Sequence, residues 1–342
     1  MSPRPLRLAL AGATGAVGRA VLEVLEDQEP SFASLKALSS GRSAGGTVSF
    51  RGDDLRVEEA RAGSFRGCDL ALLAVPAEAA RQLGPLARAE GCLVVDASAA
   101  WRDDPEVPLC LPEVNPDAVA GLGRGIAAVP CGLAAALALV LRPIRDAAGL
   151  AAVSAVALES VSGAGRRGIE QLEAEALALM NGQEPAPPTA IPYRIAFNVV
   201  PDGGARGAAG GAGDAEQRLC ADLAALLGAG PRVSATVARV PVFYGHAAAV
   251  SLSTARPLPA AEARELLRHA EGVKVVDQPA ERLYPMPMLS VNDDAVHAGR
   301  IREDPTRANG LELFLSVDNL RRGGATSLVG LARLLARRHL TK

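Results

Sequence analysis

The sequence has few aromatic residues and almost no net charge. One Trp, three Tyr and six Phe stand among 342 residues, and 36 basic residues nearly balance 38 acidic ones, for a formal net charge of −2. A base-stacking surface needs aromatic side chains, and a polyanion-binding surface needs an excess of positive charge. The composition therefore argues against nucleic acid as a partner.

Cysteines and apolar runs are too sparse for a disulfide framework or a membrane protein. The five cysteines are odd in number and show no CxxC spacing. We therefore expect a reducing, cytoplasmic location and no bound metal. The most apolar run, Gly125 to Leu141, is short for a membrane span and contains Pro130 and Gly132. It predicts a buried strand followed by a buried helix, and the N-terminal residues show no signal-peptide pattern.

Apolar strand patterns alternate with helical patterns over roughly the first 130 residues. The expected strands are Leu6 to Leu10, Leu35 to Leu38, Leu70 to Val75, Cys92 to Val95 and Ile126 to Val129. A helix is expected over Ala77 to Arg88. This alternation is typical of a parallel sheet covered on both faces. We predict an α/β fold that opens with a Rossmann-like, doubly wound parallel sheet.

Past residue 150 the pattern changes to longer β-rich segments. The expected strands are Ala152 to Leu158, Arg194 to Val199, Val233 to Val242, Ala248 to Ser253 and Leu311 to Val317. Helices are expected over Ile169 to Met180 and, with an amphipathic pattern, over Ser327 to Leu340. The Gly- and Ala-rich segment Asp202 to Gly213 predicts a mobile loop. These features indicate a second, α+β domain with a mixed sheet.

A glycine-rich turn joins the first strand to a helix, in Gly12-Ala13-Thr14-Gly15-Ala16-Val17-Gly18. Gly12 permits a tight turn, Gly15 lets backbone N–H groups approach a pyrophosphate, and Gly18 permits close packing of helix on strand. The pattern predicts dinucleotide binding. The residues expected to contact the cofactor are Gly12, Thr14, Gly15, Ala16 and Val17.

The second expected strand ends in hydroxyl groups and a cation. An NAD enzyme places Asp or Glu at this point for the ribose hydroxyls. This sequence instead has Ser39, Ser40 and Arg42, which suit a 2′-phosphate. NADP is therefore the expected cofactor.

Three residues are candidates for the chemistry. Cys131 lies where the fifth expected strand leads into a helix, and the N-terminus of a helix favours a thiolate. A buried structural cysteine explains the same position. Arg239 and His246 flank an extended run that ends in a glycine. They would present a carboxylate-binding guanidinium and an acid/base imidazole to one cleft, while a surface Arg and a packed His remain the structural alternative.

Motifs along nearly the whole chain resemble the aspartate-semialdehyde dehydrogenase family. The matching segments are the glycine turn with Ser39 to Gly45, Val95 to Arg102, Pro112 to Pro116, Ser160 to Gly165, Ile195 to Val199, Arg239 to His246, Tyr284 to Pro287, Gly299 to Arg302 and Asp318 to Arg321. Their order and spacing make chance similarity very improbable.

The resemblance implies a reaction and a set of site residues. The family converts β-aspartyl phosphate, NADPH and a proton into aspartate semialdehyde, NADP and phosphate, a step toward lysine, methionine and threonine. By position, Cys131 attacks the acyl phosphate and His246 handles the proton. The implied substrate-binding residues are Arg102, Glu159, Arg218 and Arg239, and the further cofactor-binding residues are Ser162, Gly163 and Asn319.

The resemblance also implies the domain organisation. Residues 1–130 plus 320–342 form the NADP-binding domain, because the C-terminal helix is expected to return to the first sheet. Residues 131–319 form an inserted catalytic and dimerisation domain, through which a homodimer assembles. The expected partner is a small, anionic acyl phosphate.

Some positions depart from the family pattern. Pro130 replaces an Asn before the nucleophile, Glu159 replaces a Gln that orients the substrate, and Gly330 replaces a Gln that meets the nicotinamide. The substrate-binding Glu of the family falls near Ala215. An ionised Glu159 would repel a doubly anionic substrate unless it pairs with Arg239. Two alternatives stay open: a divergent paralogue that keeps the fold and NADP binding but is catalytically impaired, or an enzyme for another acyl phosphate such as N-acetylglutamyl phosphate.

Overall fold

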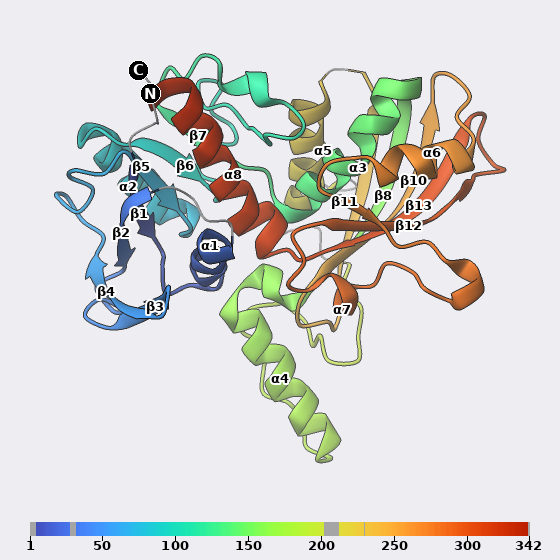
Figure 1. Ribbon diagram of the computed structural model, residues 1–342. Helices are drawn as coiled ribbons and strands as arrows, with labels where there is room; N and C mark the ends of the chain where they lie inside the picture. The colour runs from blue at the N-terminus through green and yellow to red at the C-terminus, as the bar shows by residue number, and fades with distance from the viewer. Residues whose placement is uncertain (1–4, 28–31, 202–211, 229, 341–342) are drawn as a thin grey trace. The chain divides into compact units, whose positions relative to one another are not determined.

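The computed structural model of the chain describes residues 5–27, 32–201, 212–228 and 230–340 (Figure 1). The chain forms two compact units, Met1–Cys131 with Gly323–Lys342, and Gly132–Arg322. The domain limits inferred from the sequence, after residues 130 and 319, differ from these units by a few residues and stay a prediction.

The described part of the first unit contains a seven-stranded sheet in the order β3-β4-β2-β1-β5-β6-β7. Its strands are β1 (Leu6–Ala11), β2 (Phe32–Ser39), β3 (Thr47–Phe50), β4 (Asp53–Glu59), β5 (Leu70–Leu73), β6 (Leu93–Asp96) and β7 (Ile126–Ala128). Every pairing is parallel except β3 with β4, an antiparallel edge pair. The predicted Rossmann-like parallel sheet is confirmed. Of its strands, only the edge pair β3 and β4 was not predicted from the sequence, and the residues of this pair are mostly exposed.

Helices pack on this sheet through their apolar sides. They are α1 (Ala16–Asp27), α2 (Ala77–Ala89) and α8 (Thr326–Leu335). Helix α8, from the C-terminal part of the chain, packs against α1, β5 and β6. The helix expected over Ser327 to Leu340 is α-helical only to Leu335. The following residues, Ala336–Leu340, form a π-helical turn.

The described part of the second unit contains a six-stranded sheet in the order β11-β12-β13-β10-β8-β9. Its strands are β8 (Leu150–Glu159), β9 (Arg232–Arg239), β10 (His246–Thr254), β11 (Val273–Val275), β12 (Val296–Glu303) and β13 (Gly310–Val317). The pairs β8 with β9 and β11 with β12 are parallel, and the three other pairs are antiparallel. The predicted mixed sheet is confirmed.

Five α-helices of the described residues accompany this sheet. They are α3 (Gly132–Ala148), α4 (Arg166–Met180), α5 (Asp214–Leu227), α6 (Ala260–Arg268) and α7 (Pro287–Ser290). Helix α3 contacts β10, β13, α5 and α6, and it is buried along most of its length. This burial explains the apolar run in the sequence, which is β7 followed by α3. Helix α4 extends away from the sheet (Figure 1).

Two expectations for the second unit fail or fall outside the described residues. The strand expected over Arg194 to Val199 is wrong, because this segment is irregular chain with one turn at Ala196 and Phe197. The Glu175 carboxylate accepts the N–H groups of Ile195 and Ala196 at 2.8 and 2.9 Å, which replaces the hydrogen bonds of a neighbouring strand. The loop expected over Asp202 to Gly213 lies almost entirely outside the described residues.

Among the helices that the structure describes, none combines the length and the apolar character needed to cross a bilayer.

Candidate active site

One edge of the second sheet gathers the polar residues singled out by the sequence. Strands β8 and β9 run parallel, so both end at this edge. Strand β10 is antiparallel to β8 and begins there with His246, which pairs with Val317 at the end of β13. Glu159, Arg239, His246 and Asn319 therefore come together although the sequence separates them widely.

The His246 imidazole has a defined tautomer. Its Nδ1 accepts the backbone N–H of Ser160 at 3.1 Å and lies 3.0 Å from the Ser160 hydroxyl. Because a backbone N–H only donates, Nδ1 carries a lone pair and the proton of the neutral ring sits on Nε2. Burial, with the nearby positive charge of Arg239, lowers the pKa of His246 to about 3. The imidazole is therefore neutral at physiological pH.

Gly163 leaves a space beside two hydrogen-bond donors. It lies in the short helix η2 (Val161–Ala164), which follows β8. A Cβ atom at this position would lie 3.2 Å from both Nε2 of His246 and Nη1 of Arg239. Arg239 Nη1 is buried and has no hydrogen-bond partner among the described residues. Two donors thus face one small volume that a side chain would fill, which is the arrangement needed for binding an anionic oxygen.

Asn319 connects the segments that form this edge. Its side-chain oxygen accepts the Ser162 hydroxyl and the Gly245 N–H, both at 3.1 Å. Gly132, the first residue of α3, packs against Asn319, since a Cβ there would lie 3.4 Å from its Cα. Of the cofactor residues implied by the family resemblance, Ser162, Gly163 and Asn319 are thereby brought together.

Glu159 and Arg239 form an ion pair. Glu159 Oε2 lies 3.2 Å from Arg239 Nη2, and each side chain is about one-fifth exposed. The two residues are register partners at the ends of β8 and β9. The positive charge of Arg239 therefore offsets the repulsion expected between an ionised Glu159 and an anionic substrate.

Cys131 and Arg102 belong to the first unit. Cys131 immediately precedes α3, is partly buried and forms no disulfide with the described cysteines. Arg102 follows β6, and its Nη2 donates to the Val129 carbonyl at 3.4 Å, two residues before the cysteine. The structure thus brings the proposed phosphate ligand and the proposed nucleophile to neighbouring stretches of chain.

The glycine turn has the geometry of a dinucleotide-binding loop. Gly12 has a φ of 88°, and a Cβ there would lie 2.2 Å from the Ala74 carbonyl oxygen. A Cβ on Gly18 would lie 2.0 Å from the Gly12 oxygen, so both positions require glycine. The Gly15 N–H donates to Gly12 at 2.9 Å. The N-terminus of α1, which begins at Ala16, is the feature that suits a pyrophosphate.

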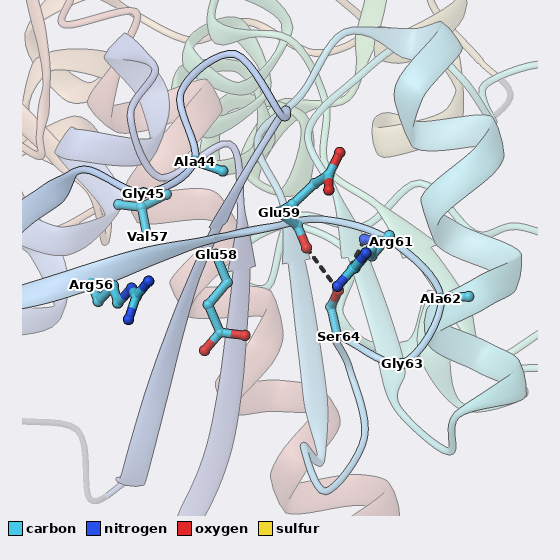
Figure 2. Close-up of a pocket in the computed structure, with 10 residues that line it drawn as sticks. All are labelled: Ala44, Gly45, Arg56, Val57, Glu58, Glu59, Arg61, Ala62, Gly63 and Ser64. Atoms are coloured by element: carbon cyan, nitrogen blue, oxygen red, sulfur yellow. Dashed lines mark hydrogen bonds between the residues drawn. The ribbon is translucent and has the colours of Figure 1, made fainter.

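A cavity of about 630 Å³ lies near the loop that follows β2, along β4 and the turn after it (Figure 2). Glu59, at the end of β4, pairs in register with Ser39. Its Oε1 would lie 2.8 Å from a Cβ on Gly41, within the loop expected to bind the 2′-phosphate. Glu59 was not predicted from the sequence, because β4 has only two apolar residues, Leu55 and Val57, and is mostly exposed.

Arg218 is the one predicted substrate residue of the second unit that lies outside this network. It is exposed on α5. The neighbouring Glu216 is occupied structurally, since its two carboxylate oxygens accept the N–H groups of Gly213 and Val237 at 2.8 and 3.0 Å. Among the described residues, no group of three or more His, Cys, Asp or Glu side chains could hold a metal ion.

Comparisons with known proteins agree with this fold. Residues 7–122 match the family model "Semialdehyde dehydrogenase, NAD binding domain", and residues 141–322 match "Semialdehyde dehydrogenase, dimerisation domain". These matches define the class as a semialdehyde dehydrogenase.

Individual relatives narrow the class. Aspartate-semialdehyde dehydrogenase of Aquifex aeolicus is 37% identical over 98% of this chain and 99% of its own length, and that of Bacillus subtilis is 36% identical over 98% and 99%. The crystal structure of aspartate semialdehyde dehydrogenase II from Vibrio cholerae superposes with a TM-score of 0.93 at 32% identity, covering 98% and 99%. The chain belongs to the aspartate-semialdehyde dehydrogenase family.

Proposed function

We propose that the protein is an NADP-dependent aspartate-semialdehyde dehydrogenase that reduces β-aspartyl phosphate to aspartate semialdehyde, on the route to lysine, methionine and threonine. The observation that carries this proposal is the pair of donors, His246 Nε2–H and Arg239 Nη1, around the space at Gly163. In a member of this family, that volume suits an oxygen of an anionic substrate.

The chemistry begins at Cys131. Its thiolate attacks the acyl carbon, the carbon–oxygen bond to phosphate breaks, and a thioester to Cys131 forms. NADPH, when bound, supplies the hydride that reduces this thioester. Breaking of the carbon–sulfur bond then releases the aldehyde and returns Cys131 as a thiolate. Arg102 binds the phosphate, and Arg239 binds the substrate α-carboxylate.

His246 starts this sequence as a neutral hydrogen-bond donor. Its Nε2–H faces the substrate volume beside Gly163 and can pass on its proton, while Ser160 holds the opposite nitrogen. Pro130 has a hydrocarbon side chain and cannot replace the amide side chain that the family has there. The donor at His246 is therefore more important in this chain.

The first unit would hold the cofactor. The N-terminus of α1 suits the pyrophosphate, because Gly12 and Gly18 admit no side chain. Ser39, Ser40 and Arg42 suit the 2′-phosphate. This choice supports NADP over NAD.

Assembly and location complete the proposal. Exposed apolar side chains occur on α4 and in the segment after it, namely Leu177, Met180, Tyr193, Phe197 and Val199. Such a surface supports a homodimer formed through the second unit. We place the enzyme in the cytoplasm.

The decisive experiment measures phosphate-dependent NADPH formation from aspartate semialdehyde. The wild type is expected to turn over, and Cys131→Ala is expected to lose at least about 10³-fold in rate, because the nucleophile is gone. Cys220→Ala, on α5, serves as the matched control and should retain activity. A wild-type rate no higher than that of Cys131→Ala would rule out the function. N-acetylglutamate semialdehyde, assayed beside it, tests the other acyl phosphate.

A further inference from the structure

The ion pair between Glu159 and Arg239 lies at the mouth of the donor site rather than in the sheet interior. The two side chains are each about one-fifth exposed, with Oε2 and Nη2 3.2 Å apart. A ligand can therefore reach both charges. The pairing of β8 with β9 in parallel register fixes them side by side.

The Arg239 guanidinium divides its two terminal nitrogens between different tasks. Nη2 pairs with Glu159, whereas Nη1 is buried, finds no hydrogen-bond partner in the part of the chain that the structure describes, and faces the space at Gly163. The cation therefore keeps a donor for a substrate carboxylate while the carboxylate of Glu159 stands beside it. The result is a positive and a negative group arranged next to each other.

The proposed substrate carries the complementary arrangement. An amino-acid derivative has a carboxylate and an ammonium group on one carbon, so its opposite charges are also adjacent. We propose that Glu159 binds the substrate α-ammonium while Arg239 binds the α-carboxylate, and that this pair selects substrates with a free amino group. The inference rests on the proposed function and adds a specificity-determining residue to it.

The carboxylate of Glu216, on α5, is not available to bind the substrate ammonium group. Both oxygens of Glu216 accept backbone N–H groups, of Gly213 and Val237. Ala215, the position nearest to the substrate-binding Glu of the family, has no polar side chain. Glu159 supplies a negative charge at the site, and an N-acylated or deaminated substrate would offer it no ammonium group.

The test compares two aldehydes that differ only in the amino group. Aspartate semialdehyde and succinate semialdehyde are assayed with wild type and Glu159→Gln. The ratio of kcat/KM for the two aldehydes should fall about tenfold or more in Glu159→Gln, because a charge-assisted hydrogen bond is lost for the aminated substrate alone. Glutamine is nearly isosteric and is the residue that the family has here, so the variant is expected to fold.

A control and a binding measurement separate the possible outcomes. Glu170→Gln removes a carboxylate from the exposed Arg166–Glu170 pair on α4 and should leave the ratio unchanged. Calorimetric titration with L-aspartate and succinate, which needs no turnover, should show the same loss of preference in Glu159→Gln. Equal effects of Glu159→Gln on both aldehydes and both acids would overturn the inference. If the wild type turns over neither aldehyde, the proposed function fails while the binding ratio still decides the role of Glu159.

Discussion

At the scale of single residues, the site depends on a position that has no side chain. Nε2 of His246 and Nη1 of Arg239 approach the place where a Gly163 Cβ would lie. Gly163 does not occupy the left-handed region of backbone conformation. Glycine is therefore needed here for the space it leaves, because the side chain of any larger residue would occupy the volume proposed for the substrate.

Substitution Gly163→Ala tests this reading. The added methyl group would press on both donors at 3.1 to 3.2 Å, and a displacement of this kind lowers kcat/KM by about 10²-fold. The melting temperature should change little, because the backbone accepts alanine. Gly121→Ala, in open space, is the matched control in the steady-state assay. Wild-type kcat/KM in Gly163→Ala would contradict the assigned role of the space.

At the scale of elements, the local patterns predicted those segments whose environment is uniform. The glycine turn and strands β1, β5 and β6 were visible because buried parallel strands are apolar throughout. The exposed β3 and β4 carry no such pattern. The segment from Arg194 to Val199 looks like a strand, yet a carboxylate from α4 satisfies its backbone. Local patterns cannot reveal a tertiary hydrogen bond of this kind.

Candidate site residues followed the same division. The type and place of Cys131, Arg239 and His246 suggested their chemistry, and the family resemblance assigned their roles. The Glu159–Arg239 pair could be posed as a possibility from the sequence, but its formation could not be decided there, because it depends on the register of β8 against β9. The pairing of His246 Nδ1 with a backbone N–H likewise needs the three-dimensional arrangement.

The loop after β2 carries a prediction about cofactor choice. Arg42→Ala removes the cation expected beside the 2′-phosphate, so KM for NADP should rise about tenfold while KM for NAD stays nearly constant. Initial rates with the two cofactors measure this difference. Arg51→Ala, which removes another exposed cation of the same unit that stacks on Phe32, should change neither value. Parallel changes for both cofactors in Arg42→Ala would place the 2′-phosphate elsewhere.

At the scale of the whole molecule, two buried groups give stability opposite dependences on pH. Burial raises the pKa of Asp96 to about 6. The buried charge destabilises the folded state above this pH, and this destabilisation disappears as pH falls from about 6 toward the ordinary pKa of an aspartate. Burial lowers the pKa of His246 to about 3. Below about pH 6.5 the unfolded chain therefore binds a proton on this ring while the folded chain does not, and the free energy of unfolding decreases as pH falls. A fall in pH therefore stabilises the first unit through Asp96 and destabilises the second unit through His246.

Asp96→Asn isolates the first effect. Between pH 5 and pH 8 the difference in free energy of unfolding between the variant and the wild type should increase by about 1.5 kcal/mol in favour of the variant, because the folded wild type takes on its buried charge over this range while the unfolded chain is already mostly ionised at pH 5. Denaturant melts at several pH values measure the difference. Asp54→Asn, at an exposed position on β4, provides the baseline. A constant difference between Asp96→Asn and wild type across this range would contradict the assignment.

The register of β8 against β9 has a consequence for folding as well as for recognition. A slip by one residue would place Glu159 opposite Ala238 or Val240 and turn its side chain to the other face of the sheet. The charge pair would then be dismantled even though most of the sheet's hydrogen bonds survived. Selectivity for the aminated aldehyde therefore reports on strand alignment, and a refolded sample that binds NADP without this selectivity would reveal a misaligned second sheet.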